Sequence, residues 1–178
     1  MNNNYKKNYI DFLNHDLDSF VTNFINKLKF PKFKNNIYLF GNGASDSIAS
    51  HIANDFSKTL NLKAFNLNNP TLLTCLSNDY GYENWIKKIL HMYAKKNDIL
   101  ILISSSGRST NIVKAANYAH KNSIKFILLT GPNPGNIVKK SFLHLKIKSD
   151  SYNIIECCHM IALTAVIDKI RNLKIKKK

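Results

Sequence analysis

Five apolar runs of strand length, separated by segments of helix length, constrain the fold of this 178-residue chain more than any other feature. Most of the runs are continuous rather than alternating, as expected for strands covered on both faces of a parallel sheet. The runs are residues 36–41, 63–67, 98–104, 125–131 and 143–148. Helices are expected between and around them, at about 5–28, 45–60, 82–95, 109–122, 134–141 and 151–173. This alternation predicts an α/β fold with a doubly wound, five-stranded parallel sheet flanked by helices.

Length and composition favour one domain over residues 1–178, because a chain of this size with 44% hydrophobic residues can bury one substantial core. No apolar run approaches the roughly 20 residues that cross a bilayer, and the first residues lack the apolar stretch of a signal peptide. We therefore expect no membrane contact and a cytoplasmic location.

The net charge of +15 raises the question of nucleic-acid binding, since a basic surface attracts phosphate. The lysines are scattered along the chain, however, and aromatic residues are not interleaved with them as in a nucleic-acid-binding module. A lysine-rich solvated surface explains the charge more simply, so nucleic acid is not an expected partner and remains the weakest functional hypothesis.

Small and polar residues end three of the predicted strands, in the stretches GNGASDS (41–47), SSSGRST (104–110) and TGPNPGN (130–136). In open α/β sheets, ligands bind beyond the carboxyl ends of the strands. Residues 104–110, here called the serine loop, supply five hydroxyl groups and a glycine just before an expected helix. Hydroxyls and backbone N–H groups at a helix start can hold a phosphate ester. Capping of the helix is the simpler alternative, but one cap needs only one hydroxyl.

The same stretches resemble the sugar isomerase (SIS) domain family, which implies a flavodoxin-like topology. Residues 103–119, ISSSGRSTNIVKAANYA, are similar to its phosphate loop, and residues 39–56, LFGNGASDSIASHIANDF, to its first loop and helix. SNDYGYENW (77–85), FILLTG (126–131) and IIECCHM (154–160) are similar to later segments. The resemblance is closest to the phosphoheptose isomerase branch, and the matches run in order from about residue 36 to 170.

Enzymes of this branch interconvert sedoheptulose 7-phosphate and an aldoheptose phosphate by moving protons between C1 and C2 through an enediol, which supplies heptose for surface polysaccharide. The resemblance implies phosphate contacts by Ser104, Ser105, Ser106 and Ser109, and first-loop substrate contacts by Asn42 and Ser45. It also implies a carboxylate near the sugar at Asp79 and a homotetramer with sites at subunit boundaries. Tyr80 and Tyr82, in the same stretch as Asp79, are candidates for substrate contact or for core packing.

The expected acid–base groups depart from the family pattern. His51 and Asp55 stand where the family carries His and Glu, four residues apart on one helical face and associated with zinc in some members. Asp55 is shorter than Glu by one methylene group. In the last helix, Glu156 replaces a Gln and Thr164 replaces a His, while His159 lies about 140° around the helix from Thr164. Threonine cannot act as a base near neutral pH.

Two functions remain open after these substitutions. In one, catalysis uses His51, Asp55, Glu156 and Asp79, and Zn²⁺ bound by His51, Asp55 and Glu156 is an optional cofactor. In the other, the activity is lost, and the chain is a phosphosugar-sensing regulator or a scaffold for a protein partner, like the replication-initiator-associated SIS proteins. The predicted small-molecule partner is a sugar phosphate in both cases.

Overall fold

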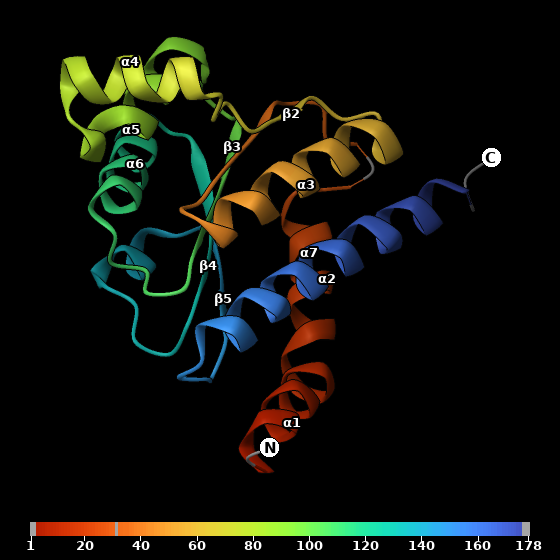
Figure 1. The fold of residues 1–178 in the computed structure, drawn as a ribbon. Helices are drawn as coiled ribbons and strands as arrows, with labels where there is room; N and C mark the ends of the chain where they lie inside the picture. Colours follow the sequence, from red (N-terminus) through yellow and green to blue (C-terminus); the bar gives the residue numbers. More distant parts are fainter. Residues whose placement is uncertain (1–2, 31, 176–178) are drawn as a thin grey trace.

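A five-stranded, all-parallel sheet forms the centre of the protein (Figure 1), as seen in a computed structural model that describes residues 3–30 and 32–175. The strands lie in the order β2-β1-β3-β4-β5, which is the flavodoxin-like topology expected from the sequence. Each predicted strand is confirmed: β1 (Ile37–Phe40), β2 (Ala64–Phe65), β3 (Ile99–Ser104), β4 (Lys125–Thr130) and β5 (Leu143–Lys146).

Helices cover both faces of this sheet. Those of the described chain are α1 (Asn3–Asp11), α2 (Leu17–Lys27), α3 (Ala44–Leu60), α4 (Pro70–Tyr80), α5 (Trp85–Tyr93), α6 (Thr110–Lys121) and α7 (Tyr152–Ile175). A π-helical turn, η1 (Phe12–Asp16), joins α1 to α2, and two 3₁₀ turns are η2 (Tyr82–Asn84) and η3 (Asn136–Lys140). Two hydrophobic cores lie between the helices and the sheet. One core contains side chains of α2, α3 and α7, and the other contains side chains of α4, α5 and α6. Figure 1 shows these two groups on opposite sides of the strands.

Burial on both faces explains the continuous apolar runs. In β3, Ile99, Ile101 and Ile103 enter the core beneath α3 and α7, whereas Leu100 and Leu102 enter the core beneath α5 and α6. All five of these residues are buried. Successive side chains of a strand point to opposite faces of the sheet. When helices cover both faces, every side chain of the strand is buried, and no position favours a polar residue.

One helix, α4, lies between β2 and the expected helix at 82–95 and was not predicted from the sequence. Its start carries two recognisable signals: Asn69 caps the helix, accepting from the Leu72 N–H at 2.9 Å, and Pro70 occupies the first turn. The expected helix itself begins later, because residues 82–84 form η2 and α5 starts only at Trp85. The expected helix at 134–141 is the 3₁₀ turn η3.

Both terminal helical segments lie close to their predicted bounds. The segment expected at about 5–28 is helical from Asn3 to Lys27, with the π turn η1 in its middle, and α7 covers the segment expected at 151–173. Phe12, the first residue of the π turn, is buried in the core. Within residues 3–30 and 32–175, we find no helix that has both the length and the apolar character needed to span a bilayer.

The strand order places the candidate site. β1 pairs with β2 on one side and with β3 on the other, and α3 and α6, which follow β1 and β3, cover opposite faces of the sheet. The chain therefore diverges at the carboxyl ends of β1 and β3, which is where ligands bind in doubly wound sheets. Residues 41–47 and the serine loop leave the sheet at this point.

Candidate functional site

A cavity of about 210 Å³ opens between the carboxyl ends of β1 and β3 and the start of α7. All of the expected phosphate and substrate contacts line it, together with Glu156. This serine cavity is lined by Asn42, Ser45, Ile103, Ser104, Ser105, Ser106, Ser109, Tyr152 and Glu156. Residues from three separate parts of the chain thus meet at one place.

The serine loop is held in shape by its own hydroxyl oxygens. The N–H of Gly107, which has a φ of +60°, donates to the Ser104 carbonyl at 3.0 Å and to Ser104 Oγ at 3.1 Å. The N–H of Arg108 donates to Ser106 Oγ at 3.2 Å. A hydroxyl that accepts from the backbone still has its own O–H to donate. Ser104 and Ser106 can therefore maintain the loop and bind an anion at the same time.

Ser105 has a different environment. Its carbonyl accepts from the Gly131 N–H at 2.8 Å, which ties the loop to the end of β4. Its Oγ atom is buried and has no hydrogen-bond partner among the described residues. A buried polar atom without a partner is uncommon and needs an explanation. Ser105 lines the serine cavity, so an acceptor bound in the cavity would satisfy this hydroxyl.

The capping alternative for the serine loop does not agree with the geometry. Ser109 immediately precedes α6, but its side chain makes no capping hydrogen bond. Near the start of this helix, the N–H of Ile112 is instead accepted by Asn111 Oδ1 at 3.0 Å. The Ser109 hydroxyl, which has no hydrogen-bond partner within residues 3–30 and 32–175, thus lies at the positive end of α6, where the aligned backbone dipoles favour an anion.

The loop after β1 is folded tightly against the start of α3. The N–H of Gly41 donates to Asp46 Oδ1 at 3.1 Å, and Asn66 Nδ2 donates to the same oxygen at 3.0 Å. A Cβ atom on Gly41 would lie 2.5 Å from the backbone carbon of Ser45, so only glycine fits there. This turn brings Asn42 and the buried Ser45 to the cavity.

The remaining catalytic candidates lie outside the serine cavity. His51 Nε2 and Asp55 Oδ2 are 3.2 Å apart on α3, as their spacing predicts, with 54% and 32% of their side chains exposed. Asp79 is exposed on α4, where its carboxylate accepts from Asn78 Nδ2 at 3.1 Å. Neither the His51–Asp55 pair nor Asp79 lines the cavity. Within one chain, Glu156 is thus the catalytic candidate that the structure brings to the serine loop.

The chain does not form the expected zinc set. Across residues 3–30 and 32–175, no three His, Cys, Asp or Glu side chains come close enough together to hold a metal ion. His51 and Asp55 are adjacent, but Glu156 does not join them, because it points into the serine cavity from α7. The residues of a single chain therefore do not fit a bound Zn²⁺ at this site.

His159 and Thr164 of α7 are both engaged within the protein. His159 is fully buried with Nε2 3.3 Å from the Thr130 carbonyl, and burial lowers the pKa of this imidazole to about 4. The Thr164 hydroxyl donates to the carbonyls of Met160 and Ile161, both at 3.0 Å, in its own helix. Neither side chain supplies a base to the serine cavity.

A second cavity, of about 200 Å³, adjoins the first and shares Ser105, Ser106 and Tyr152 with it. Sequence reasoning missed Tyr152, although it precedes Glu156 by four residues and so lies on the same helical face. For Arg108, the sequence left open a phosphate contact or a side chain that faces solvent, and the structure places this residue at the second cavity. The second cavity is lined by Ser105, Ser106, Arg108, Pro132, Asn133, Ser149, Asp150, Tyr152 and Ile155.

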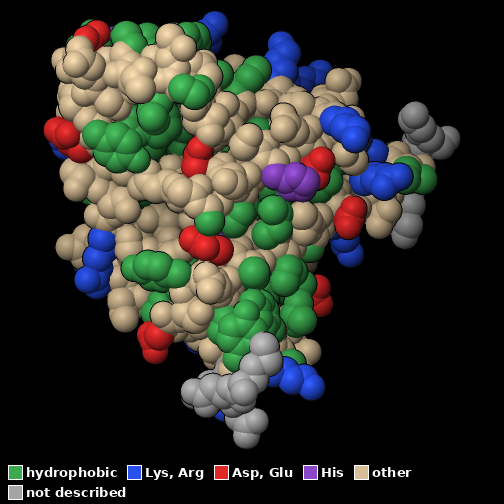
Figure 2. All heavy atoms as spheres, in the orientation of Figure 1, with side chains coloured by type: hydrophobic (Ala, Val, Ile, Leu, Met, Phe, Trp, Pro, Cys, Tyr) green, Lys and Arg blue, Asp and Glu red, His purple; other side chains and the backbone are tan. Residues whose placement is uncertain are grey.

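Basic side chains do not gather into one surface on the face drawn in Figure 2. Its Lys and Arg side chains lie in separate groups near the edges of the molecule. A nucleic-acid site would concentrate them along a stripe or patch. This distribution agrees with a chain whose lysines are spread over a solvated surface.

Comparison with known proteins identifies the fold and the site region. The SIS domain family model matches residues 30–131. The phosphoheptose isomerase of Helicobacter pylori is 34% identical over 140 residues, which cover 75% of this chain and 73% of that protein. The probable phosphoheptose isomerase of Thermoplasma volcanium is 31% identical over 141 residues, covering 75% and 71%.

Solved structures give the same result over nearly the whole chain. The phosphoheptose isomerase of Neisseria gonorrhoeae superposes with a TM-score of 0.84 at 25% identity, covering 94% of this chain and 93% of that one. A phosphoheptose isomerase from Francisella tularensis gives 0.83 at 26% identity, covering 95% and 93%. The chain belongs to the SIS domain family and, within it, to the phosphoheptose isomerase branch.

Proposed function

We propose that the protein is an aldose–ketose isomerase that acts on sedoheptulose 7-phosphate or a closely related sugar phosphate. The observation that carries this proposal is the serine cavity, in which hydroxyl groups and the start of α6 surround a space next to one carboxylate, Glu156. The similarity to named phosphoheptose isomerases supports this substrate class.

The serine loop would hold the phosphate group. Ser104 and Ser106 have O–H groups to donate, and Ser109 lies at the positive end of α6. Ser105 has a buried hydroxyl without a partner in the part of the chain that the structure describes. A phosphate held in this way would anchor the substrate at one end. The energy of that contact then orients the reacting carbons, which is how remote binding groups assist catalysis.

Glu156 is the proposed base within the cavity. Isomerisation removes a proton from one of the two carbons, C1 or C2, while the carbonyl oxygen gains a proton, which forms the enediol. The other carbon then gains a proton while its own hydroxyl group loses one, which forms the new carbonyl. A carboxylate that accepts and then donates the carbon-bound proton can serve both halves of the reaction. Asn42 and Ser45 would orient the sugar oxygens beside it.

His51, Asp55 and Asp79 fit this proposal only if a second subunit completes the site. All three keep solvent-accessible side chains outside the serine cavity of their own chain. We propose a homotetramer in which these groups face the cavity of a neighbouring subunit. Light scattering at micromolar protein should then give four times the chain mass, and a monomer would contradict this part of the proposal.

The enzyme proposal is tested by incubating the purified protein with sedoheptulose 7-phosphate, with and without Zn²⁺, and measuring the aldose product. Turnover that Glu156→Gln abolishes would support it, because glutamine keeps the shape of glutamate and cannot accept the proton. The variant Asp168→Asn, the same carboxylate-to-amide change at an exposed position of α7 outside the cavity, is the matched control and should retain turnover.

A phosphosugar-binding regulator is the second candidate, favoured by Asp55 and Thr164, which depart from the catalytic Glu and His of the family. Saturable binding of sedoheptulose 7-phosphate without turnover in either condition would support the regulator and reject the enzyme. The phosphate site is common to both. Combining Ser104→Ala with Ser106→Ala should weaken sugar phosphate binding by at least about tenfold, and unchanged affinity would reject the assigned cavity.

A further inference from the structure

Asn42, the expected sugar contact after β1, is held by two residues from other parts of the chain. Asn42 Nδ2 donates to Asn111 Oδ1 at 3.1 Å, and Asn111 Nδ2 donates back to Asn42 Oδ1 at 2.7 Å. The Tyr82 hydroxyl donates to Asn42 Oδ1 at 3.0 Å. These three hydrogen bonds join the loop after β1, the start of α6 and the turn η2 at the edge of the serine cavity.

The direction of the amide pair is set by the backbone of α6. Asn111 is 2% exposed, and its Oδ1 accepts from the Ile112 N–H at 3.0 Å. Turning the Asn111 amide over would place its NH₂ group against that N–H, which would bring two donors together. The orientation of Asn111 is therefore fixed, and the reciprocal pair fixes Asn42 in the complementary orientation.

Tyr82 completes the arrangement by occupying the other acceptor position of Asn42. An amide oxygen has two lone pairs, and Asn42 Oδ1 receives one hydrogen bond from Asn111 and one from Tyr82. Of the two N–H groups of Asn42, one donates to Asn111. The other N–H has no partner among the described residues, so Asn42 has only a donor left for a ligand in the cavity.

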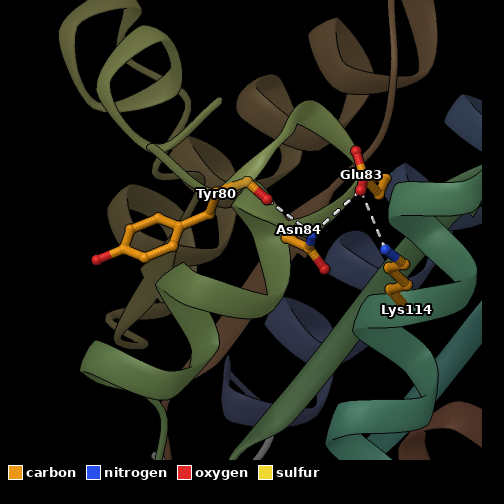
Figure 3. Close-up of polar contacts among 4 residues, drawn as sticks. All are labelled: Tyr80, Glu83, Asn84 and Lys114. Atoms are coloured by element: carbon orange, nitrogen blue, oxygen red, sulfur yellow. Dashed lines mark hydrogen bonds and ion pairs between the residues drawn. The ribbon is translucent and has the colours of Figure 1, made fainter. Parts of the chain in front are cut away.

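The turn that carries Tyr82 is anchored to the same helix as Asn111. Lys114 Nζ lies 3.2 Å from Glu83 Oε1, and Asn84 Nδ2 donates to Glu83 Oε1 at 3.2 Å and to the Tyr80 carbonyl at 2.8 Å (Figure 3). A hydrogen bond from its own backbone N–H and the contact with Lys114 lower the pKa of Glu83, so this carboxyl stays charged. Tyr82 thus reaches Asn42 from a turn whose position is fixed by α6.

We propose that Tyr82 and Asn111 are positioning residues, which hold the Asn42 amide so that its free N–H donates to an acceptor oxygen of the bound sugar phosphate. This inference rests on the proposed sugar phosphate site and goes beyond it, because it assigns a direction to the Asn42 contact. A ligand that presents an oxygen acceptor at this position is favoured. A ligand group that can only donate, such as an ammonium group, would meet an Asn42 oxygen that is already saturated.

Tyr82→Phe tests the tyrosine with little structural disturbance, because the ring is about half exposed and only the hydroxyl is removed. The dissociation constant of sedoheptulose 7-phosphate, measured by calorimetry, should rise about fivefold, the effect of one hydrogen bond. The melting temperature should stay unchanged. Tyr80→Phe is the matched control, because Tyr80, although a candidate for substrate contact, lines neither cavity and is similarly exposed. Figure 3 shows its ring pointing away from Glu83 and Lys114.

A double-mutant cycle with Asn42→Ala separates positioning from a general structural role. If Tyr82 acts through Asn42, then Tyr82→Phe has no further effect on affinity once Asn42 is alanine. Asn111→Leu should weaken binding in the wild-type background and likewise lose its effect beside Asn42→Ala. A fivefold effect of Tyr82→Phe that persists beside Asn42→Ala overturns the inference, as does affinity equal to that of the Tyr80→Phe control.

The experiment distinguishes failure of the proposed function from failure of the roles assigned to Tyr82 and Asn111. A wild-type protein that does not bind sedoheptulose 7-phosphate overturns the proposed function, and this inference with it. A wild-type protein that binds the sugar phosphate, with additive effects in the cycle, overturns only the assignment of Tyr82 and Asn111. Because calorimetry measures binding, the result is the same for an active enzyme and for a regulator without turnover.

Discussion

The carbonyl of Ser105 accepts a hydrogen bond from the Gly131 N–H at 2.8 Å, and this contact joins the loops that follow β3 and β4. The approach is close enough that a Cβ atom on Gly131 would lie 2.6 Å from the Ser105 oxygen. The backbone of Ser105 is therefore positioned without help from its side chain. Its hydroxyl, buried and without a partner in the described chain, is left for a ligand.

Removal of the Ser105 hydroxyl should affect binding and leave folding intact. Ser105→Ala strands no partner group, so the free energy of unfolding should change by less than about 0.5 kcal/mol. A hydrogen bond to a charged phosphate is stronger than a neutral one, so the dissociation constant of sedoheptulose 7-phosphate should rise about tenfold. Urea unfolding and calorimetry measure the two quantities, and unchanged affinity would remove Ser105 from the site.

Gly107 is expected to be essential for the conformation of the serine loop. Its φ is +60°, and a Cβ atom there would lie 2.9 Å from Pro134 Cβ and 3.1 Å from Thr130 Cγ2. Gly107→Ala should therefore lower the free energy of unfolding by about 2 kcal/mol or more and weaken phosphate binding, through backbone strain and overlap.

Gly135→Ala is the control for that substitution. Gly135 has a φ of −75°, and an added Cβ atom would meet its nearest neighbour at an ordinary 3.5 Å. Alanine there should stabilise the protein by about 0.5 kcal/mol, because it reduces the freedom of the unfolded chain. Equal stabilities of the two variants in urea would show that the Gly107 conformation does not need glycine.

Acid should destabilise the protein through His159. Burial lowers the pKa of this imidazole to about 4 in the folded state, from an ordinary value near 6.5 in the unfolded chain. The stability is complete above pH 6.5 and falls as the pH drops toward 4, because the unfolded chain binds a proton that the folded one does not. The expected loss is roughly 3 kcal/mol.

Urea unfolding at several pH values between 7 and 4 measures this dependence. His159→Gln should reduce the slope, since glutamine can still donate to the Thr130 carbonyl and does not titrate. Burial also lowers the pKa of His144, which contributes in the same direction and leaves part of the slope. An identical slope in wild type and His159→Gln would assign the acid sensitivity to other groups.

Restoring the family residues should raise turnover if the chain is an impaired enzyme. Asp55→Glu lengthens the carboxylate that pairs with His51, and Thr164→His supplies the base that the family carries. Among the described residues, the Thr164 hydroxyl donates only within its own helix, so its loss breaks no hydrogen bond between elements there. The double variant should increase kcat for sedoheptulose 7-phosphate by at least about tenfold. Asp55→Asn is the control, because it changes the same position without supplying a carboxylate, and it should not increase kcat. If the double variant shows no gain in kcat, residues 55 and 164 are not catalytic positions in this chain.

The five strands and the serine loop could be predicted because their signals are local. Continuous apolar runs such as residues 98–104 indicate strands buried on both faces, and hydroxyl residues that end such a run indicate a polar strand exit. The helix α4 was missed because its apolar residues are interrupted by polar ones, although Asn69 and Pro70 mark its start. More weight on capping residues would have found it.

The contacts of the candidate site join residues that are far apart in sequence, and local sequence patterns do not predict such contacts. Asn42 and Asn111 are 69 residues apart in sequence, and Tyr82 is 40 residues from Asn42, so no periodicity relates them. The same limit explains the expected zinc set. His51 and Asp55 meet because they are four residues apart on one helix, whereas the position of Glu156 depends on how α7 packs against α2 and α3.

The amino-acid sequence by itself determined the α/β class, the buried strands and a hydroxyl-rich loop at the end of β3, because each follows from the order of neighbouring residues. Only the tertiary structure decided that Glu156 faces the serine loop and that Asn111 and Tyr82 hold Asn42. The physical reason is that strand order and helix packing are chosen by burial of apolar surface over the whole chain. Residues far apart in sequence become neighbours only when the chain folds and buries that apolar surface.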